Sequence, residues 1–186
     1  WGLVDIDHQK RLVDLAISSM GKLPRTGGDG TPVHERVRKE MRAILAGDEI
    51  PAWLDETARS LLRDAQRQYK ALGLDETWFV VEGHNVYLFL WQGDLFQDAL
   101  SALLRRQGLE VTNAGICIQI KRMTANQVTE CLTKIGAQPC PCPGGVIEIK
   151  DVRNPEKWDW VLPSDMVIGS YASRALALEE AYAWCR

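Results

Sequence analysis

The period of the hydrophobic pattern changes at Gly73, and this change limits the fold more than any other feature of the sequence. Before Gly73, apolar side chains recur every three or four residues, which is typical of helices that bury one face. After it, segments 77–82 and 86–91 are rich in β-branched and aromatic residues and flank a short Gly-containing turn. This pattern predicts a β-hairpin, and the helical stripe over 94–107 predicts a helix directly after it.

The same order of elements then repeats. Segments 109–112 and 116–121 predict a second hairpin, and Thr124 and Gln127 have the spacing of a capping box that opens a second helix, ending at Gly136. Two consecutive strand–strand–helix units predict an antiparallel sheet with helices on one face, which is an α+β fold.

The segment before Gly73 predicts a two-helix hairpin. Thr31 is placed to cap the first helix, with Pro32 at its first position, and Asp55 is placed to cap the second. A short connector between two amphipathic helices favours an antiparallel arrangement. The expected apolar stripes are Val33, Val37, Met41, Ile44 and Leu45 in the first helix, and Ala58, Leu61, Leu62, Ala65, Tyr69 and Leu72 in the second.

The two ends of the chain give weaker patterns. Segment 3–17 alternates like a hairpin, although the spacing of some of its apolar residues also suits a helix. A Gly-rich loop over 21–30 predicts a boundary between residues 1–30 and an α+β domain over 31–186. Near the other end, 146–149 predicts one more strand, and 163–185 predicts a helical tail with a break near Gly169.

Composition excludes several classes of protein. With 46% hydrophobic residues and a net charge of −3 over 186 residues, the chain is too apolar and too weakly charged to be disordered. Five cysteines are an odd number and too few for a disulfide scaffold, so we expect a reducing, cytoplasmic setting. No apolar run approaches the length of a membrane span, and no secretory leader is evident. Because the chain begins at Trp1, we expect it to be a piece of a longer protein.

The catalytic and metal-binding motifs in the sequence are all incomplete. The Gly-rich segment 27–30 precedes a helix but lacks the Gly-Lys-Ser/Thr ending of a phosphate-binding loop. His34 and Glu35 begin a zinc-protease pattern that fails because residue 38 is arginine. Cys140 and Cys142 offer half of a zinc site, without the second pair of ligands. We therefore expect no metal, no cofactor and no catalytic activity in this chain by itself.

Basic side chains form the clearest candidate binding surface. At 100° per residue, the four basic residues of the second helix fall within about 80° of arc, opposite its apolar stripe. This basic row is either an ordinary solvated surface or a surface that contacts nucleic-acid phosphates. Its members are Arg59, Arg63, Arg67 and Lys70, and the first helix adds a similar group made of Arg38, Lys39 and Arg42.

Three aromatic residues give a second candidate surface. Tyr87, Phe89 and Trp91 alternate along one predicted strand and so share one face. If that face is open, they can stack on the bases of a single strand or dock a protein. The alternative is that they are buried beneath the two N-terminal helices.

Several motifs resemble the C-terminal accessory region of large helicase-related (Lhr-like) DEAD/DEAH-box helicases of superfamily 2. The resemblance spans nearly the whole chain. It rests on Trp1-x-Leu3-Val4-Asp5-Ile6-Asp7, Val33-His34-x-x-Val37-x-x-x-Met41, Pro51-x-x-Leu54-Asp55-x-x-Ala58-x-x-Leu61-Leu62, Lys157-Trp158-Asp159-x-x-Leu162-Pro163 and Tyr171-Ala172-Ser173-Arg174-x-Leu176.

The resemblance implies an accessory domain that lacks the ATPase motor, because the chain has no Walker A motif, no DEAD/DEAH box and no arginine finger. Residues 1–30 would be the end of a preceding β-rich portion. The implied partners are the motor domains of the same polypeptide and, weakly, single-stranded or forked DNA, with ATP and Mg²⁺ used only by the parent helicase. No catalytic residue of the family maps onto this segment. The alternative is a free-standing chaperone-like or adaptor module that binds protein.

Overall fold

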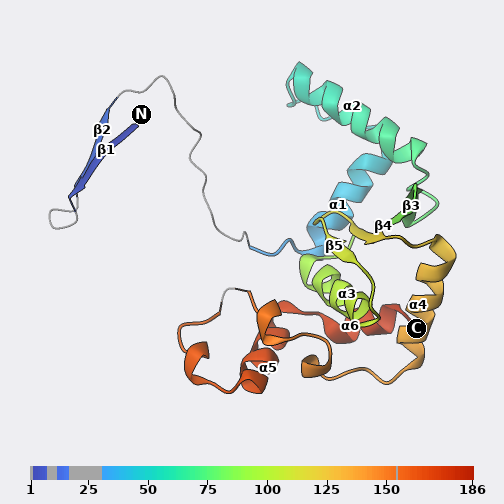
Figure 1. The fold of residues 1–186 in the computed structure, drawn as a ribbon. Helices are drawn as coiled ribbons and strands as arrows, with labels where there is room; N and C mark the ends of the chain where they lie inside the picture. The colour runs from blue at the N-terminus through green and yellow to red at the C-terminus, as the bar shows by residue number, and fades with distance from the viewer. Residues whose placement is uncertain (1, 8–11, 17–30, 154) are drawn as a thin grey trace. The chain divides into compact units, whose positions relative to one another are not determined.

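The computed structural model describes residues 2–7, 12–16, 31–153 and 155–186. The chain divides into two compact units, Trp1–Thr31 and Pro32–Arg186 (Figure 1). In the first unit, β1 (Gly2–Asp7) pairs antiparallel with β2 (Leu12–Ala16). Strands in this segment confirm the hairpin and exclude the helical alternative, while the predicted loop at 21–30 lies outside the described residues.

The second unit is built on a four-stranded antiparallel sheet. Its strands are β3 (Phe79–Glu82), β4 (Asn85–Leu88), β5 (Val111–Asn113) and β6 (Ile118–Lys121), in the order β3-β4-β6-β5. The two predicted hairpins are therefore both formed, and they meet through the pairing of β4 with β6. This arrangement confirms the predicted α+β fold.

Three helices cover one face of this sheet: α3 (Asp94–Arg106), α4 (Ala125–Ala137) and α6 (Leu178–Trp184). Val86 and Leu88 on β4 face the same side as Ile118 and Ile120 on β6, and all four are at most 1% exposed. Burying each such side chain contributes about 1.5–3 kcal/mol. The predicted capping box of α4 is present, since the Thr124 and Gln127 side chains each bond the other's backbone N–H.

Helices α1 (Glu35–Ala46) and α2 (Glu56–Ala71) form the predicted hairpin and pack against the sheet's other face at one end. In Figure 1, α2 extends away from the sheet. Asp55 caps α2 as predicted, its Oδ1 accepting from the N–H of Ala58 at 2.7 Å.

The predicted cap of α1 is wrong, because the helix begins only at Glu35 and His34 is its N-cap. The preceding residue, Val33, is held in place by Asp94 at the start of α3. The Asp94 carboxylate accepts from the Val33 N–H at 2.8 Å, and the Asp94 N–H donates to the Val33 carbonyl at 3.0 Å. These two bonds keep Thr31–Val33 out of the helix.

The strand predicted at 146–149 is also wrong. A single turn of 3₁₀ helix, Pro143–Gly145, precedes this segment, and a second one, Ile149–Asp151, begins at its last residue. The Asp151 carboxylate accepts from the N–H of Glu148 at 2.8 Å, so a local bond takes the donor that a strand would need. Between the turns, Ile147 is buried against Ala102 and Tyr171.

The predicted helical tail is formed by α5 (Ser164–Ala175) and α6, but the break lies at Leu176–Ala177 and not near Gly169. The N–H of Ala177 donates to the carbonyl of Leu95 at 3.1 Å, which fixes the chain between the two helices. Beyond this break, α6 enters the core beside α4, where the Tyr182 hydroxyl donates to the carbonyl of Gly136 at 3.3 Å.

No helix in the described ranges has both the length and the apolar composition that a bilayer crossing requires.

Candidate nucleic-acid interface

The basic row of α2 lies on the side of the helix that faces the connector from α1. Arg63, Arg67 and Lys70 are exposed. Arg59 differs from the other three, because it is only partly exposed and its guanidinium donates to the carbonyl of Ala52 in the connector. The structure therefore brings together three of the four predicted side chains at the surface.

A hollow of about 430 Å³ runs beside this row, between α2 and the connector from α1. Carboxylates compete for two of the cations that line it: Lys70 Nζ lies 2.6 Å from Asp48 Oδ1, and Arg67 pairs with Asp64. Arg63 also lines the hollow, and among the described residues it has no carboxylate partner. The site is therefore a mixed-charge groove with one uncompensated arginine.

The basic residues of α1 do not form the predicted outward cluster. Arg38 is 8% exposed, and its guanidinium lies 2.9 Å from Asp94 Oδ1. Sequence spacing placed it away from the apolar face, but the carboxylate at the start of α3 draws it inward. The chain thus buries a charge together with its partner, which is the usual condition for burying an arginine. We correct the prediction for Arg38, which is not available to phosphate.

The other two residues of that group are exposed but engaged. Lys39 pairs with Glu35 one helical turn earlier, and Arg42 Nε donates to the Tyr69 hydroxyl at 3.3 Å. The prediction that they bind nucleic acid stays a prediction.

The predicted aromatic surface separates into two parts. Trp91 is 4% exposed and packs with Tyr69 and Leu74 beneath the two-helix hairpin, as the alternative interpretation expected, and Phe89 joins the same cluster. Trp91 has a backbone φ of 56°, a left-handed conformation, and β4 has already ended at Leu88. Trp91 therefore cannot serve as a stacking platform.

Tyr87 is the one of the three that does not join this cluster. It is partly exposed, and its hydroxyl accepts a hydrogen bond from Gln119 Nε2 at 3.0 Å on the neighbouring strand β6. A single half-buried ring whose hydroxyl is already hydrogen-bonded to Gln119 offers little surface for base stacking.

The three most exposed of the described tryptophans lie elsewhere, in connecting segments. Trp53, Trp158 and Trp160 are 83%, 61% and 78% exposed, and Lys157 Nζ lies 4.8 Å from the centre of the Trp158 ring. No periodic pattern marks these residues as a surface, because they belong to connectors. Their proximity to Pro51, Pro155 and Pro163 in the sequence was the available signal for a loop position.

The cysteines do not form a reactive centre. Burial raises the pKa of Cys117 and Cys131. Burial, and then repulsion from the Cys131 thiolate that forms at high pH, raises the pKa of Cys185 to about 12. These thiols therefore stay protonated at neutral pH, and the thiolate is the nucleophilic form. Cys140 and Cys142 are exposed in a loop, and within the described ranges no three His, Cys, Asp or Glu side chains gather as metal ligands.

Comparison of the chain with protein-family models, with curated proteins and with solved structures found no match.

Proposed function

We propose that this chain is a non-catalytic accessory domain of an ATP-dependent helicase, and that the basic row of α2 contacts nucleic-acid phosphates. The sequence motifs supply the resemblance to helicases. The observation that carries the binding role is the row Arg63, Arg67 and Lys70, which stands exposed along a groove on a helix that extends away from the sheet. In this proposal ATP and Mg²⁺ act only in the motor, and the protein is cytoplasmic.

The carboxylates in the groove do not prevent phosphate binding. Asp64 and Asp48 are 53% and 90% exposed at their side chains, so their ion pairs with Arg67 and Lys70 are surface pairs. Such pairs contribute about 0–1 kcal/mol each, since water screens them. A phosphate can therefore replace Asp64 and Asp48 as the partner of Arg67 and Lys70 at little cost. At Arg63 no carboxylate among the described residues has to be replaced.

The same charges limit the affinity. The net charge of −3 repels a polyanion at long range, and only about three cations are available in the groove. We expect weak, sequence-independent binding of single-stranded or forked DNA. The motor domains of the same polypeptide would then supply most of the affinity.

A titration of labelled single-stranded and forked DNA at low salt tests the proposal. Changing Arg63 and Arg67 to Glu should weaken binding and flatten the log–log salt dependence by about 0.7 to 0.9 for each phosphate that the variant no longer neutralises. Both side chains are exposed, so the fold should be retained.

The matched control is the pair Arg106→Glu and Lys134→Glu, which changes net charge equally at exposed positions on α3 and α4. Equal binding by the two double variants would reject a role for α2. The coding sequence upstream of Trp1 tests the other half of the proposal, which expects Walker A and DEAD/DEAH motifs there.

A second candidate function is protein binding through the two-helix hairpin. Val37, Ile44 and Leu61 belong to the predicted buried stripes, yet they are between 50% and 64% exposed, and Trp53 at the connector is 83% exposed. An apolar surface of this kind suits docking to another protein surface, either the motor or the target of an adaptor. A start codon close upstream of Trp1 would favour the free-standing adaptor.

A further inference from the structure

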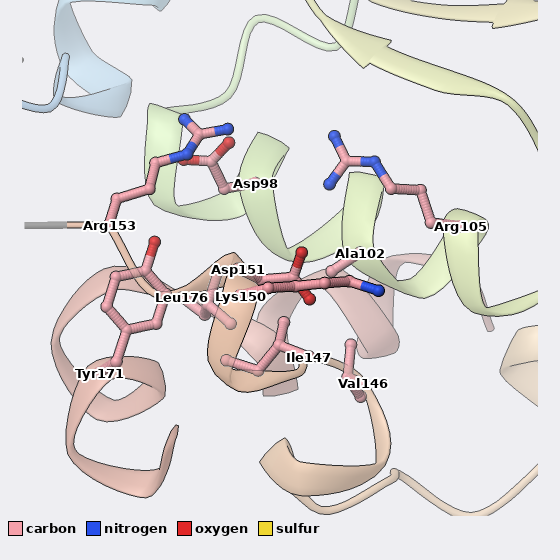
Figure 2. A pocket seen from close by; sticks show the side chains of 10 residues that line it. All are labelled: Asp98, Ala102, Arg105, Val146, Ile147, Lys150, Asp151, Arg153, Tyr171 and Leu176. Atoms are coloured by element: carbon pink, nitrogen blue, oxygen red, sulfur yellow. The ribbon is translucent and has the colours of Figure 1, made fainter. Parts of the chain in front are cut away.

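A separate hollow of about 200 Å³ lies between α3, α5 and the segment 146–153 (Figure 2). Its floor is apolar: Ala102, Ile147 and Tyr171 are each at most 9% exposed and belong to one buried cluster, and Leu176 completes it. This hollow has no part in the α2 groove and shares none of its residues.

Three cations stand around the rim. Figure 2 shows Arg153 at one end, with the Tyr171 hydroxyl pointing toward it, and Arg105 and the Lys150 amine toward the other end. Arg105 Nε donates to the Val111 carbonyl at 3.3 Å, which leaves both terminal nitrogens of this guanidinium without a partner among the described residues. Arg153 likewise has no carboxylate partner there.

The two acids of the rim are already engaged. Asp98 Oδ1 accepts from Asn113 Nδ2 at 2.9 Å, and Asp151 Oδ2 accepts from the backbone N–H of Glu148 at 2.8 Å. The Lys150–Glu148 pair is exposed on both sides, so water screens it. The rim therefore sets three cations against two carboxylates, and the guanidinium groups of Arg105 and Arg153 are its cations without a carboxylate partner among the described residues.

We infer that this hollow binds a small anion with a single-ring body, carrying one carboxylate or phosphate group. A dry apolar cavity of about 150 Å³ accepts benzene, so about 200 Å³ suits one six-membered ring and the start of a polar group. The ring lies on the apolar floor, and the anionic group meets the guanidinium forks of Arg105 and Arg153, whose planar geometry matches two oxygens of a carboxylate or phosphate.

An NMR titration of the ¹⁵N-labelled chain tests this inference with four probes. Phenyl phosphate and benzoate carry both parts of the expected ligand, phenol carries the ring alone, and inorganic phosphate carries the anion alone. We expect phenyl phosphate or benzoate to shift the amide signals of Ala102 and Ile147, with a Kd near or below about 1 mM. Phenol should bind at least about tenfold more weakly, because the absence of one charge-assisted hydrogen bond costs roughly that factor. Inorganic phosphate should also bind at least about tenfold more weakly, because it has no ring to bury on the apolar floor.

Arg105→Met should weaken binding by at least about fivefold, since it removes one solvent-exposed charged donor. Arg106→Met is the matched control, because Arg106 is the next residue of the same helix and does not line the hollow. Arg153→Met is a second, independent variant on the opposite rim. The inference is overturned if neither anionic ring compound shifts these amides, if phenol binds as tightly as phenyl phosphate, or if Arg105→Met and Arg106→Met behave alike.

Discussion

Replacing Gly136 by alanine should loosen the last helix of the fold. Gly136 lies in the last turn of α4, where the chain passes against the end of α6. A β-carbon built on Gly136 would lie 2.7 Å from the carbonyl carbon of Cys185 and 2.9 Å from Cα of Arg186, and closer still to the Cys185 oxygen. All three atoms are backbone atoms, which cannot turn aside as the end of a flexible side chain can. The segment at Cys185 must therefore move.

The expected loss is the difference between one stabilising effect and two destabilising ones. Alanine in place of glycine inside a helix stabilises the protein by about 1 kcal/mol. Overpacking of a close approach costs about 1–3 kcal/mol. Shifting α6 also removes part of the burial of Leu178 and Tyr182, each of which contributes about 1.5–3 kcal/mol. We expect Gly136→Ala to lower the free energy of unfolding by about 2 kcal/mol.

Urea unfolding followed by far-UV circular dichroism measures this change. With a slope near 2 kcal/mol per M, a loss of about 2 kcal/mol lowers the midpoint by about 1 M. The control is Gly169→Ala in the middle of α5, where a β-carbon meets no atom within 4 Å. That variant should gain up to about 1 kcal/mol. If Gly136→Ala proves as stable as Gly169→Ala, α4 and Cys185 do not approach each other this closely.

Three further perturbations have expected outcomes. Arg38→Met should destabilise the chain by about 2–3 kcal/mol in a urea melt, because it leaves the partly buried Asp94 carboxylate without its cation; Arg36→Met, an exposed neighbour, should change stability by less than about 0.5 kcal/mol. Thr124→Ala should cost about 1 kcal/mol by the same measurement, since it removes the hydroxyl half of a capping box. At pH 8, a disulfide reagent should modify Cys140 and Cys142 rapidly but Cys185 only on unfolding, because the pKa of Cys185 is raised to about 12; fast modification of Cys185 in the folded chain would contradict its burial.

Features that depend on a few neighbouring residues were predictable. The caps at Asp55 and Thr124 require only a side chain and an amide three residues later, and both are formed as expected. The two hairpins were likewise predictable, because each needs only two neighbouring β-rich segments and the short turn between them, and both are formed. In each case the determining contact lies within the element or its immediate partner.

Features that depend on distant segments were not predictable from pattern. Arg38 is drawn inward by Asp94, 56 residues later, and the same carboxylate delays the start of α1. Nothing in the spacing of α1 encodes that carboxylate. Hydrophobic spacing also overstated the burial of Leu61, because it shows which face of a helix is apolar but not whether another element covers that face.

The ring-sized hollow was missed for the same reason. Its rim residues Arg105, Lys150 and Arg153 come from a helix and from an irregular segment whose strand prediction failed. Only the packing of Ile147 against Ala102 and Tyr171 brings these side chains together. The pattern within each separate element does not indicate that these three side chains lie around one hollow.

The late return of α6 to the core has a consequence for synthesis on the ribosome. Its residues Leu178, Ala181 and Tyr182 complete the same core as Ile118 and Ile120 on β6, about 60 residues earlier. At about 5–20 residues per second, some 3 to 13 s pass between translation of Ile120 and of Cys185. During that interval α3 and α4 cover only part of this face of the sheet. A strip of apolar side chains that α6 later covers is therefore exposed to solvent on the nascent chain. A chaperone that holds nascent chains would find its binding site in this interval, and the strip disappears once α6 has emerged and docked.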